Sequence, residues 1–420
     1  MANIFPIPRS LREALAILTN LPVALLAMLW RRLLYRTTFI AVTGSFGKTT
    51  AKDFLAAILS RVGPTVKTQG SANGRGGIER TILGARPHHR FVVVEIGTDR
   101  PGGMIRASLV VRPNVAIILN VGRAHAKEFR SLDRIASEKA SLLRFLKKDG
   151  VAVLNGDDPR VAAMAATCPG KVLLFGSSEK FDVCFLDPAA VWPGRLEFTV
   201  VHAGQKAAIK TQLVGVHWAP AVTGAVAAAL ACGATLSQAV DASASVEPYV
   251  ARMQPVTLPG GIIMLRDEHI GSIDGFEQAF HVLSQARATR RILVISDYTD
   301  SKKRPRQRMR DIARLASRTG IALVFVGERS LEGMESARKE GIPPENSHGF
   351  LHMEEAAAFL RTELRRGDLI LLRGRMQDHL SRLYFQILGS VSCRLTKCGR
   401  RRPCDDCSKL GFKPMAPNVF

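Results

Sequence analysis

The sequence predicts an α/β protein built from two domains, each a mostly parallel sheet with helices on both faces. Short apolar runs rich in valine and isoleucine alternate with helical patterns along most of the 420 residues, which is typical of parallel sheets. A single domain has roughly 100 to 200 residues, so the length favours two or three. Hydrophobic residues make up 46% of the chain, which is enough for packed cores.

We expect a central domain over residues 39–247 and a smaller, Rossmann-like α/β domain over residues 248–390. In the first, strands are predicted at 38–42, 91–94, 115–119 and 151–154, and helices at 50–61, 132–147 and 219–232. Between 185 and 213, apolar and polar residues alternate between turns, which indicates a small antiparallel excursion. In the second, strands are predicted at 261–265, 291–295, 322–326 and 369–372.

Residues 1–38 precede the first predicted strand and contain an apolar stretch from about residue 14 to residue 30. Thr19, Asn20 and Pro22 interrupt it, and arginines flank it on both sides. A membrane-spanning helix needs roughly 20 apolar residues, and no small-residue cleavage site follows, so a signal peptide is not expected. Three interpretations stay open: a helix packed on the next domain, an interfacial helix held on anionic lipid by its arginines, and a true span.

The charge and the cysteine content indicate which binding partners and which cellular compartment to expect. Lysine plus arginine outnumber aspartate plus glutamate by 59 to 36, and the net charge of +23 favours anionic partners such as nucleotides, acidic substrates or a membrane surface. The seven cysteines are unevenly distributed, which argues against a disulfide framework and for a reducing compartment. We therefore expect a cytoplasmic protein, peripheral to the inner face of the membrane if its N-terminal helix is interfacial.

The segment Gly44-Ser45-Phe46-Gly47-Lys48-Thr49-Thr50 lies directly between a predicted strand and a predicted helix. In that setting, backbone N–H groups and the helix N-terminus can surround a phosphate. Lys48 would contact the β- and γ-phosphates of ATP, and the Thr49 hydroxyl would bind the Mg²⁺ that bridges them. The spacing is shorter than the general G-x-x-x-x-G-K-[ST] pattern, and an ordinary glycine turn is the alternative. The strand-loop-helix context favours a domain of the phosphate-binding-loop type.

Three ionisable residues are expected near this loop. Glu95 ends the strand at 91–94, and His125 follows the strand at 115–119 through a short loop. The carboxyl ends of parallel strands share one edge of the sheet, so both residues should reach the crevice that holds the loop. Lys139 lies on a predicted helix beyond His125. Taken singly, each of the three is more typical of a surface position.

In order along the chain, these motifs resemble the Mur ligase family of ATP-dependent muramyl-peptide ligases, most closely the branch that adds D-alanyl-D-alanine. The resemblance runs from Thr38 to about Arg375 and rests on Thr43–Thr50, Lys67–Asn73, Val94–Gly102, Arg112–Val115, Asn120–His125, Ser137–Ala140 and Leu154–Pro159. It implies that ATP phosphorylates a substrate carboxylate, that an amine or amino-acid acceptor attacks the acyl phosphate, and that ADP and phosphate leave.

The resemblance also implies a site with two Mg²⁺ ions. In the family, the lysine at the position of Lys139 is carbamylated by CO₂, and it helps to hold the second ion together with the residues that match Glu95 and His125. Two divalent ions offset the negative charge that concentrates when a phosphoryl group moves to a carboxylate. A lysine ammonium would instead add a positive charge in the wrong place.

The resemblance is looser at the nucleotide contacts. The family's nucleotide-contacting positions correspond here to Asn155, Asp157, Arg252 and Asp267. The family usually has Asp-x-Tyr-Asn-Ala where Asp267–Gly271 reads Asp-Glu-His-Ile-Gly. Its His-Asn pair reads His217-Trp218, so Trp218 would replace the lost adenine contact by stacking.

Members of the family in the peptidoglycan pathway carry an N-terminal domain that binds the uridine diphosphate sugar, whereas about 38 residues precede the first predicted strand here. We therefore expect an acidic carboxylate substrate that is lipid-linked or otherwise presented at a membrane, rather than a soluble UDP-muramyl one. The N-terminal helix and the charge of +23 would fit such a substrate.

Residues 391–420 are expected to form a basic tail with the spacing Cys393-x4-Cys398-x5-Cys404-x2-Cys407. Four thiolates can hold Zn²⁺ tetrahedrally, and the last pair has the spacing of a zinc knuckle, although the first pair is wider. An iron–sulfur cluster and free thiols are the alternatives. The tail would serve either as a stabilising clip or as a contact for an acidic partner.

Three hypotheses of function follow, and the favoured one is a ligase that joins an acidic carboxylate to an amine or amino acid. The second is a catalytically degenerate nucleotide-binding partner or regulatory protein, which the departures at Asp267–Gly271 suggest. The third is nucleic-acid binding through the cysteine-rich tail, with a steep fall of affinity with salt as its signature. Nucleic acid is the least favoured of these partners, and the oligomeric state is not predicted.

Overall fold

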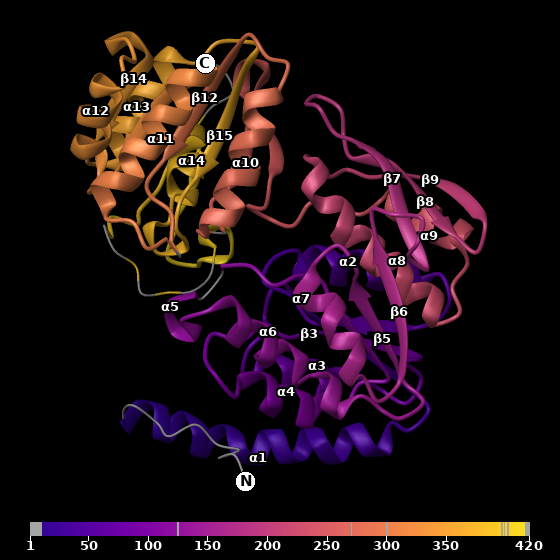
Figure 1. The fold of residues 1–420 in the computed structure, drawn as a ribbon. Helices are drawn as coiled ribbons and strands as arrows, with labels where there is room; N and C mark the ends of the chain where they lie inside the picture. Colours follow the sequence, from indigo (N-terminus) through magenta and orange to yellow (C-terminus); the bar gives the residue numbers. More distant parts are fainter. Residues whose placement is uncertain are drawn as a thin grey trace. The chain divides into compact units, whose positions relative to one another are not determined.

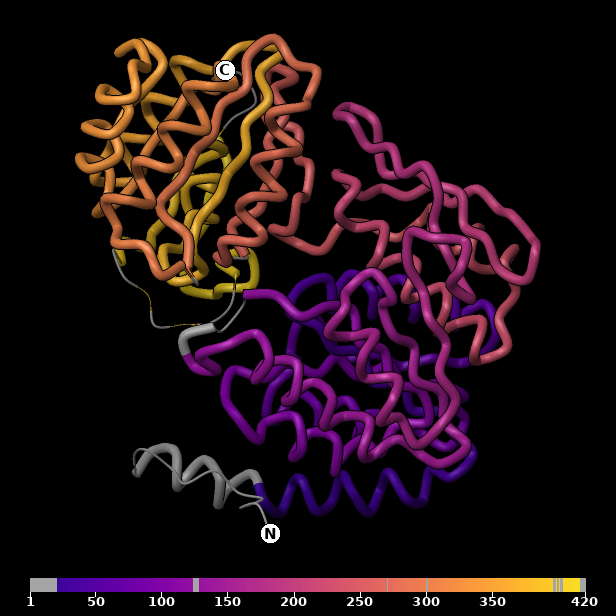
Figure 2. Tube along the Cα trace, viewed as in Figure 1, coloured from indigo at the N-terminus to yellow at the C-terminus, as the bar shows by residue number. Residues whose placement is uncertain are grey.

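The structure is a computed structural model that describes residues 11–123, 126–269, 271–299, 301–395, 398, 400 and 403–415, with side chains from residue 21 onward except 126 and 127. The chain forms two compact units, which can be followed by colour along the sequence (Figures 1 and 2). Unit 1 comprises residues up to 189 with 196–212 and 216–247, and unit 2 comprises 190–195, 213–215 and residues from 248 onward. Both units are α/β, as the sequence predicts.

In the described part of unit 1, nine strands form one sheet in the order β2-β3-β1-β4-β5-β6-β7-β8-β9. Neighbours from β2 to β7 are parallel, whereas β7, β8 and β9 pair antiparallel, which confirms the predicted excursion. The strands are β1 (Thr38–Thr43), β2 (Thr65–Lys67), β3 (Phe91–Glu95), β4 (Val115–Ile118), β5 (Val151–Asn155), β6 (Lys171–Gly176), β7 (Val183–Ala189), β8 (Glu197–His202) and β9 (Gln205–Lys210). Because β1 lies between β3 and β4, the loops after these three strands meet at one edge.

The helices of unit 1 confirm most of the predicted ones, with one correction. They are α1 (Leu11–Leu33), α2 (Lys48–Ser60), α3 (Gly77–Gly84), α4 (Gly103–Val111), α5 (Ala126–Phe129), α6 (Leu132–Ala140), α7 (Pro159–Ala162), α8 (Ala219–Ala231) and α9 (Leu236–Ser243). The helix predicted over 132–147 ends at Ala140. Leu142, Leu143 and Leu146 are all buried and continue the helical spacing of the buried Ile135 and Lys139, so the apolar pattern runs past the point where the helix ends.

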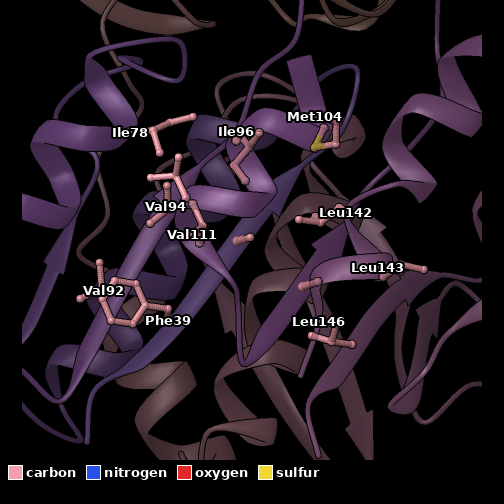
Figure 3. Close-up of a cluster of buried hydrophobic side chains, with 14 of the residues drawn as sticks. Phe39, Ile78, Val92, Val94, Ile96, Met104, Val111, Leu142, Leu143 and Leu146 are labelled. Atoms are coloured by element: carbon pink, nitrogen blue, oxygen red, sulfur yellow. The ribbon is translucent and has the colours of Figure 1, made fainter. Parts of the chain in front are cut away.

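The core of unit 1 packs the sheet against α1, α3 and α4, and Figure 3 shows part of it. Val92 and Val94 lie two positions apart on β3 and therefore point to the same face, where Phe39 of β1 joins them in the cluster. Burial of each such side chain stabilises the fold by about 1.5–3 kcal/mol. This packing fixes the ends of β1 and β3, where the glycine loop and Glu95 lie.

Helix α1 lies along α3 and α4 (Figure 1), which is the first of the three interpretations left open by the sequence. The Trp30 indole donates to the Ala85 carbonyl at 3.0 Å. The buried Arg31 guanidinium donates to the carbonyls of Val111 at 2.9 Å and Arg112 at 3.0 Å, at the C-terminus of α4, where a cation offsets the helix dipole. None of the described helices has the length and apolar character needed to cross a membrane.

In the described part of unit 2, six strands form a sheet in the order β10-β11-β15-β12-β13-β14, parallel except for β10. The strands are β10 (Gln254–Leu258), β11 (Ile262–Asp267), β12 (Arg290–Ile295), β13 (Ala322–Val326), β14 (Ser347–Phe350) and β15 (Asp368–Arg373). The helices are α10 (Ile273–Gln285), α11 (Pro305–Thr319), α12 (Ser330–Lys339), α13 (Met353–Glu363) and α14 (Ser381–Leu388). The two edge strands, β10 with its proline and the short β14, were not predicted.

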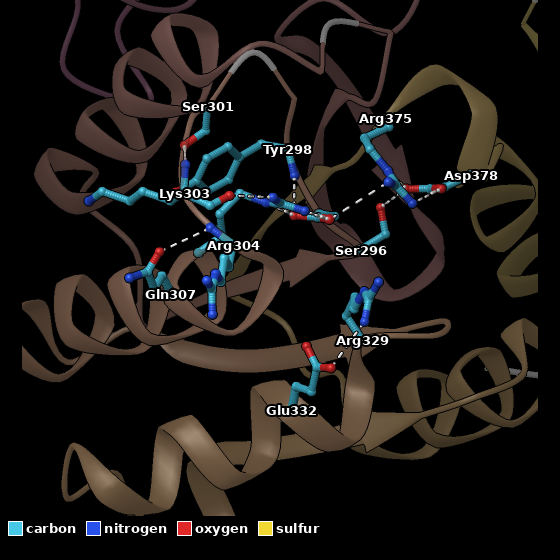
Figure 4. Close-up of polar contacts among 12 residues, drawn as sticks. Ser296, Tyr298, Ser301, Lys303, Arg304, Gln307, Arg329, Glu332, Arg375 and Asp378 are labelled. Carbon is cyan, nitrogen blue, oxygen red and sulfur yellow. Dashed lines mark hydrogen bonds and ion pairs between the residues drawn. The ribbon is translucent and has the colours of Figure 1, made fainter.

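Ion pairs tie together the loops that follow β12 and β15 (Figure 4). Arg375 makes a bidentate pair with Asp378, with nitrogen–oxygen distances of 2.7 and 2.8 Å. The Ser296 hydroxyl donates to the same carboxylate at 2.6 Å. Arg308 of α11 pairs with Asp297, which follows β12, at 2.7 Å. Because these cations are paired internally, they hold the loops of unit 2 in place.

Candidate active site

The glycine loop joins β1 to α2 and is held by a residue that follows β4, the neighbour of β1 in the sheet. Gly47 has a φ of 80°, in the left-handed region that glycine adopts without strain. The Asn120 side chain accepts the N–H groups of Ser45 at 2.9 Å and Phe46 at 3.0 Å. The Lys48 ammonium donates to the Gly44 carbonyl at 2.9 Å, so it lies over the loop at the start of α2. The geometry is that of a phosphate-binding loop at a helix N-terminus.

Thr49 and Glu95 meet directly behind the loop. Glu95 is the last residue of β3 and is fully buried. The Thr49 hydroxyl donates to its two carboxylate oxygens at 2.9 and 3.1 Å. The structure therefore brings together the hydroxyl and the carboxylate that the sequence placed at one edge of the sheet.

Two residues that the sequence did not single out hold Glu95. The Asn73 amide donates to Glu95 Oε1 at 2.7 Å. The Lys52 ammonium lies 3.9 Å from Glu95 Oε2 and donates to the carbonyls of Thr68, at 3.1 Å, and Gly70, so it fixes the loop that carries Asn73. Burial lowers the pKa of Lys52, while the neighbouring carboxylates of Asp53 and Glu95 oppose that shift. Asn73 lies within the matching motif Lys67–Asn73, whereas Lys52 lies outside the matching motifs.

Lys139 lies on α6 and is buried, with 7% of its surface exposed. Burial lowers its pKa to about 7, the Lys48 ammonium contributes in the same direction, and Glu138 opposes the shift. The adjacent Glu138 carboxylate accepts the N–H groups of Gly102 at 3.0 Å and Met104 at 2.7 Å, at the start of α4. Lys139 is thus anchored within electrostatic reach of the loop lysine. His125 lies outside the described residues.

Asn155 and Asp157 tie together the carboxyl ends of neighbouring strands. The Asn155 amide donates to the Leu119 carbonyl at 2.8 Å and accepts the N–H of Asp157 at 3.0 Å. The Asp157 carboxylate accepts the backbone N–H of Ser177 at 2.7 Å and its hydroxyl at 3.0 Å. Trp218 is only 3% exposed, so its ring belongs to the core, and the predicted stacking on adenine is wrong.

Arg252 and Asp267 belong to unit 2. Asp267 is buried, pairs with Arg373 and accepts the N–H of Met253 at 3.0 Å. Burial raises the pKa of Asp267 to about 6, although the Arg373 cation opposes the rise. The Arg252 guanidinium lies over the Tyr249 ring, 5.4 Å from its centroid, and its Nε is buried without a hydrogen-bond partner in the described chain. Both the ion pair and the hydrogen bond of Asp267 are therefore made within unit 2.

The structure does not support the predicted zinc site. Among the described residues, which include all four tail cysteines, no group of three or more His, Cys, Asp or Glu is placed to hold a metal ion. Burial raises the pKa of the Cys404 thiol to about 12, and its sulfur lies 3.6 Å from Nδ1 of His379. Instead, Asp405 fastens the tail through a bidentate ion pair with Arg266, at 2.6 and 2.9 Å.

The fold and the site define an enzyme of the phosphate-binding-loop class with a buried carboxylate and a buried lysine beside the loop. The Mur ligase middle domain matches residues 42–229. The UDP-N-acetylmuramoyl-tripeptide--D-alanyl-D-alanine ligase of Mycobacterium tuberculosis is 31% identical over 377 residues, which cover 85% of this chain and 74% of the relative. The chain therefore belongs to the Mur ligase family of ATP-dependent, amide-bond-forming ligases.

Solved structures agree with this assignment. A crystal structure of MurF from Acinetobacter baumannii is similar with a TM-score of 0.80 and 26% identity, and the match covers 87% of this chain and 80% of that one. The MurF ligase of Thermotoga maritima in complex with ADP shares the fold with a TM-score of 0.72 at 22% identity, over 84% of this chain and 80% of that one.

Proposed function

We propose that this protein joins an acidic carboxylate donor to an amine or amino-acid acceptor through an acyl phosphate made from ATP. The observation that carries the proposal is the contact between the Thr49 hydroxyl and the Glu95 carboxylate behind the phosphate-binding loop. Oxygen donors of these two kinds suit Mg²⁺, which proteins commonly bind through one or two carboxylates together with substrate phosphates. Thr49 and Glu95 would hold the ion, and Asn73 and Lys52 would keep Glu95 in position.

Lys139 is proposed to act as a carbamate. In carbamylation, the lysine ammonium first loses a proton, and a bond then forms between the neutral Nζ and the carbon of CO₂. A second proton leaves the nitrogen, so that the cation becomes an anion. The reaction needs the neutral amine, and burial beside the Lys48 ammonium favours that form because it lowers the pKa of Lys139. The carbamate, Glu95 and His125 are proposed to hold a second Mg²⁺, with His125 assigned from its place in the sequence.

The proposed reaction has two steps, a phosphoryl transfer to the donor and an acyl transfer to the acceptor. A carboxylate oxygen of the donor attacks the γ-phosphorus of ATP, the bond to the bridging oxygen breaks, and ADP leaves. The neutral amine of the acceptor then attacks the acyl carbon, the carbon–oxygen bond to phosphate breaks, and the amine loses a proton. In this scheme the loop N–H groups and Lys48 stabilise the charge on the phosphates, because they are held in place before reaction.

The substrates are proposed from charge and from the relatives. The net charge of +23 suits an acidic donor, and the Mycobacterium tuberculosis relative is named for a UDP-N-acetylmuramoyl-tripeptide donor and a D-alanyl-D-alanine acceptor. A carboxylate of the muramyl-peptide class, presented in solution or at a membrane, and an amino acid or dipeptide are therefore the first pair to test.

The test is release of ADP from purified protein with ATP, Mg²⁺, UDP-N-acetylmuramoyl-tripeptide or a simpler acidic carboxylate, and D-alanyl-D-alanine or single amino acids. We expect release to require a donor, to rise with an acceptor, and to be lost in Lys48→Ala and Lys139→Ala. Lys206→Ala is the matched control, because that lysine on β9 is 63% exposed. ATP binding without acceptor-stimulated turnover for any donor in the set would overturn the proposal.

A nucleotide-binding regulatory protein without turnover is the second candidate, and the state of Asp267 favours it. That carboxylate is buried and already paired with Arg373, in a segment that departs from the family pattern. On this alternative, the wild type would release no phosphate, and Lys48→Ala would abolish association with a partner that requires ATP.

A further inference from the structure

Helix α1 has a buried face that fixes it to unit 1. Ala24 and Ala27 of the helix, with Leu34 directly after it, are 6%, 0% and 3% exposed and pack into the core cluster. Arg31 on the same face bonds to the C-terminus of α4. Because α3 and α4 lie against this face, α1 lies flat along the surface of the unit rather than projecting from it (Figure 1).

The opposite face of α1 is also apolar, and it is exposed. Leu21, Leu25, Leu29 and Leu33 recur every four residues and are 40%, 51%, 57% and 67% exposed, so they form one stripe along the helix. Leu26, which is 57% exposed, widens the stripe. Contiguous apolar surface of this kind marks a site of contact with a partner or a membrane.

Exposed cations flank the stripe. Arg32 lies within the helix, and Arg36 follows it, with its guanidinium 5.6 Å from the centroid of the exposed Tyr35 ring. Arg86 and Arg112 are exposed at the two points where α1 is bonded to the unit, next to Ala85 and Val111. Arginine and tyrosine beside an apolar stripe are typical of helices that lie in the headgroup region of a bilayer.

We propose that the outer face of α1 docks this protein on the surface of an anionic lipid membrane. The leucines would enter the boundary between headgroups and acyl chains, while the arginines would contact lipid phosphates. Charge complementarity favours this occupant over a second copy of the chain, because two copies would bring together the same arginines and two net charges of +23. The docking goes beyond the proposed function, since amide-bond formation in solution does not require it.

The test is flotation of the full-length protein with vesicles of phosphatidylcholine alone and with vesicles that also contain phosphatidylglycerol. We expect binding to the anionic vesicles that weakens with salt. Arg32→Glu/Arg36→Glu should bind at least roughly 30-fold less well, because the loss of each cation near an anionic surface costs about fivefold and the introduced carboxylates are repelled by it. Leu25→Gln/Leu29→Gln/Leu33→Gln should lose at least roughly 100-fold.

Two matched controls test whether the loss of binding is specific to α1, or follows from changing exposed leucines or the net charge anywhere on the protein. Leu331→Gln/Leu351→Gln changes leucines of unit 2 that are 82% and 58% exposed, and Lys206→Glu/Lys210→Glu changes exposed lysines of β9. Both should bind vesicles as the wild type does. Equal binding of the wild type to both vesicle types would overturn the proposal. So would a wild-type dimer in sedimentation that binds no vesicles and dissociates in the triple leucine variant, because the stripe would then be an interface between copies.

Discussion

Replacing Lys139 by methionine should make the protein more stable while abolishing its activity. Burial and the Lys48 charge lower the pKa of Lys139 from its ordinary value of 10.5 to about 7. Each pKa unit corresponds to about 1.4 kcal/mol, so keeping this amine neutral in the folded state costs roughly 4 kcal/mol at pH 7. Methionine has a similar length and fills the same space without a charge to desolvate, so the variant should recover most of that free energy.

The sign of the pH dependence gives a second readout. Between about pH 7 and pH 10.5 the unfolded chain binds a proton at Lys139 that the folded chain does not, so wild-type stability should rise with pH across this window relative to the variant. Urea unfolding in CO₂-free buffer, followed by circular dichroism at several pH values, measures the difference. Lys206→Met should change stability by less than about 0.5 kcal/mol. A Lys139→Met protein no more stable than the wild type at pH 7 would refute the burial argument.

Three further variants address the metal ligands, their support and the tail. Glu95→Gln keeps the side-chain shape but removes the charge, so ADP release should fall by at least about 100-fold; a fall of less than tenfold would argue against a ligand role. Asn73→Ala removes a hydrogen bond to Glu95, so the Mg²⁺ concentration for half-maximal rate should rise roughly 10-fold, while an unchanged Mg²⁺ dependence would remove Asn73 from the site. Asp405→Asn weakens the pair with the buried Arg266, and urea unfolding should show a loss of roughly 2–3 kcal/mol; no loss would mean that the pair does not fasten the tail.

Much of the fold could be predicted because its central strands have a strong local signal. The runs at β1, β3 and β4 are apolar and rich in β-branched residues, since they are buried on both faces. The edge strands carry a weaker signal, because β10 includes Pro255 and β14 includes Gly349 and polar residues. The end of α6 at Ala140 could not be predicted either, because the buried Leu142 and Leu143 continue the helical spacing beyond it.

The site was predictable where a residue's place on a strand determines its position. Glu95 ends β3, so sheet geometry alone places it near the glycine loop. Asn73 and Lys52 could not be found in this way, because one lies in an irregular loop and the other reaches Glu95 only through the packing of α2 on β3. In the tail, cysteine spacing predicted a metal site that the described residues do not support. The contact that fastens the tail is instead the ion pair between Asp405 and Arg266.

The most direct test of an acyl-phosphate ligase is to follow the oxygen atoms of the donor. UDP-N-acetylmuramoyl-tripeptide labelled with ¹⁸O in its carboxylates would be incubated with protein, ATP, Mg²⁺ and D-alanyl-D-alanine, and the released phosphate analysed by mass spectrometry. We predict that each amide bond formed transfers one ¹⁸O atom to phosphate, and that Lys48→Ala releases none. Phosphate released at the wild-type rate without label would show that water, not the donor carboxylate, attacks ATP, and would contradict the account.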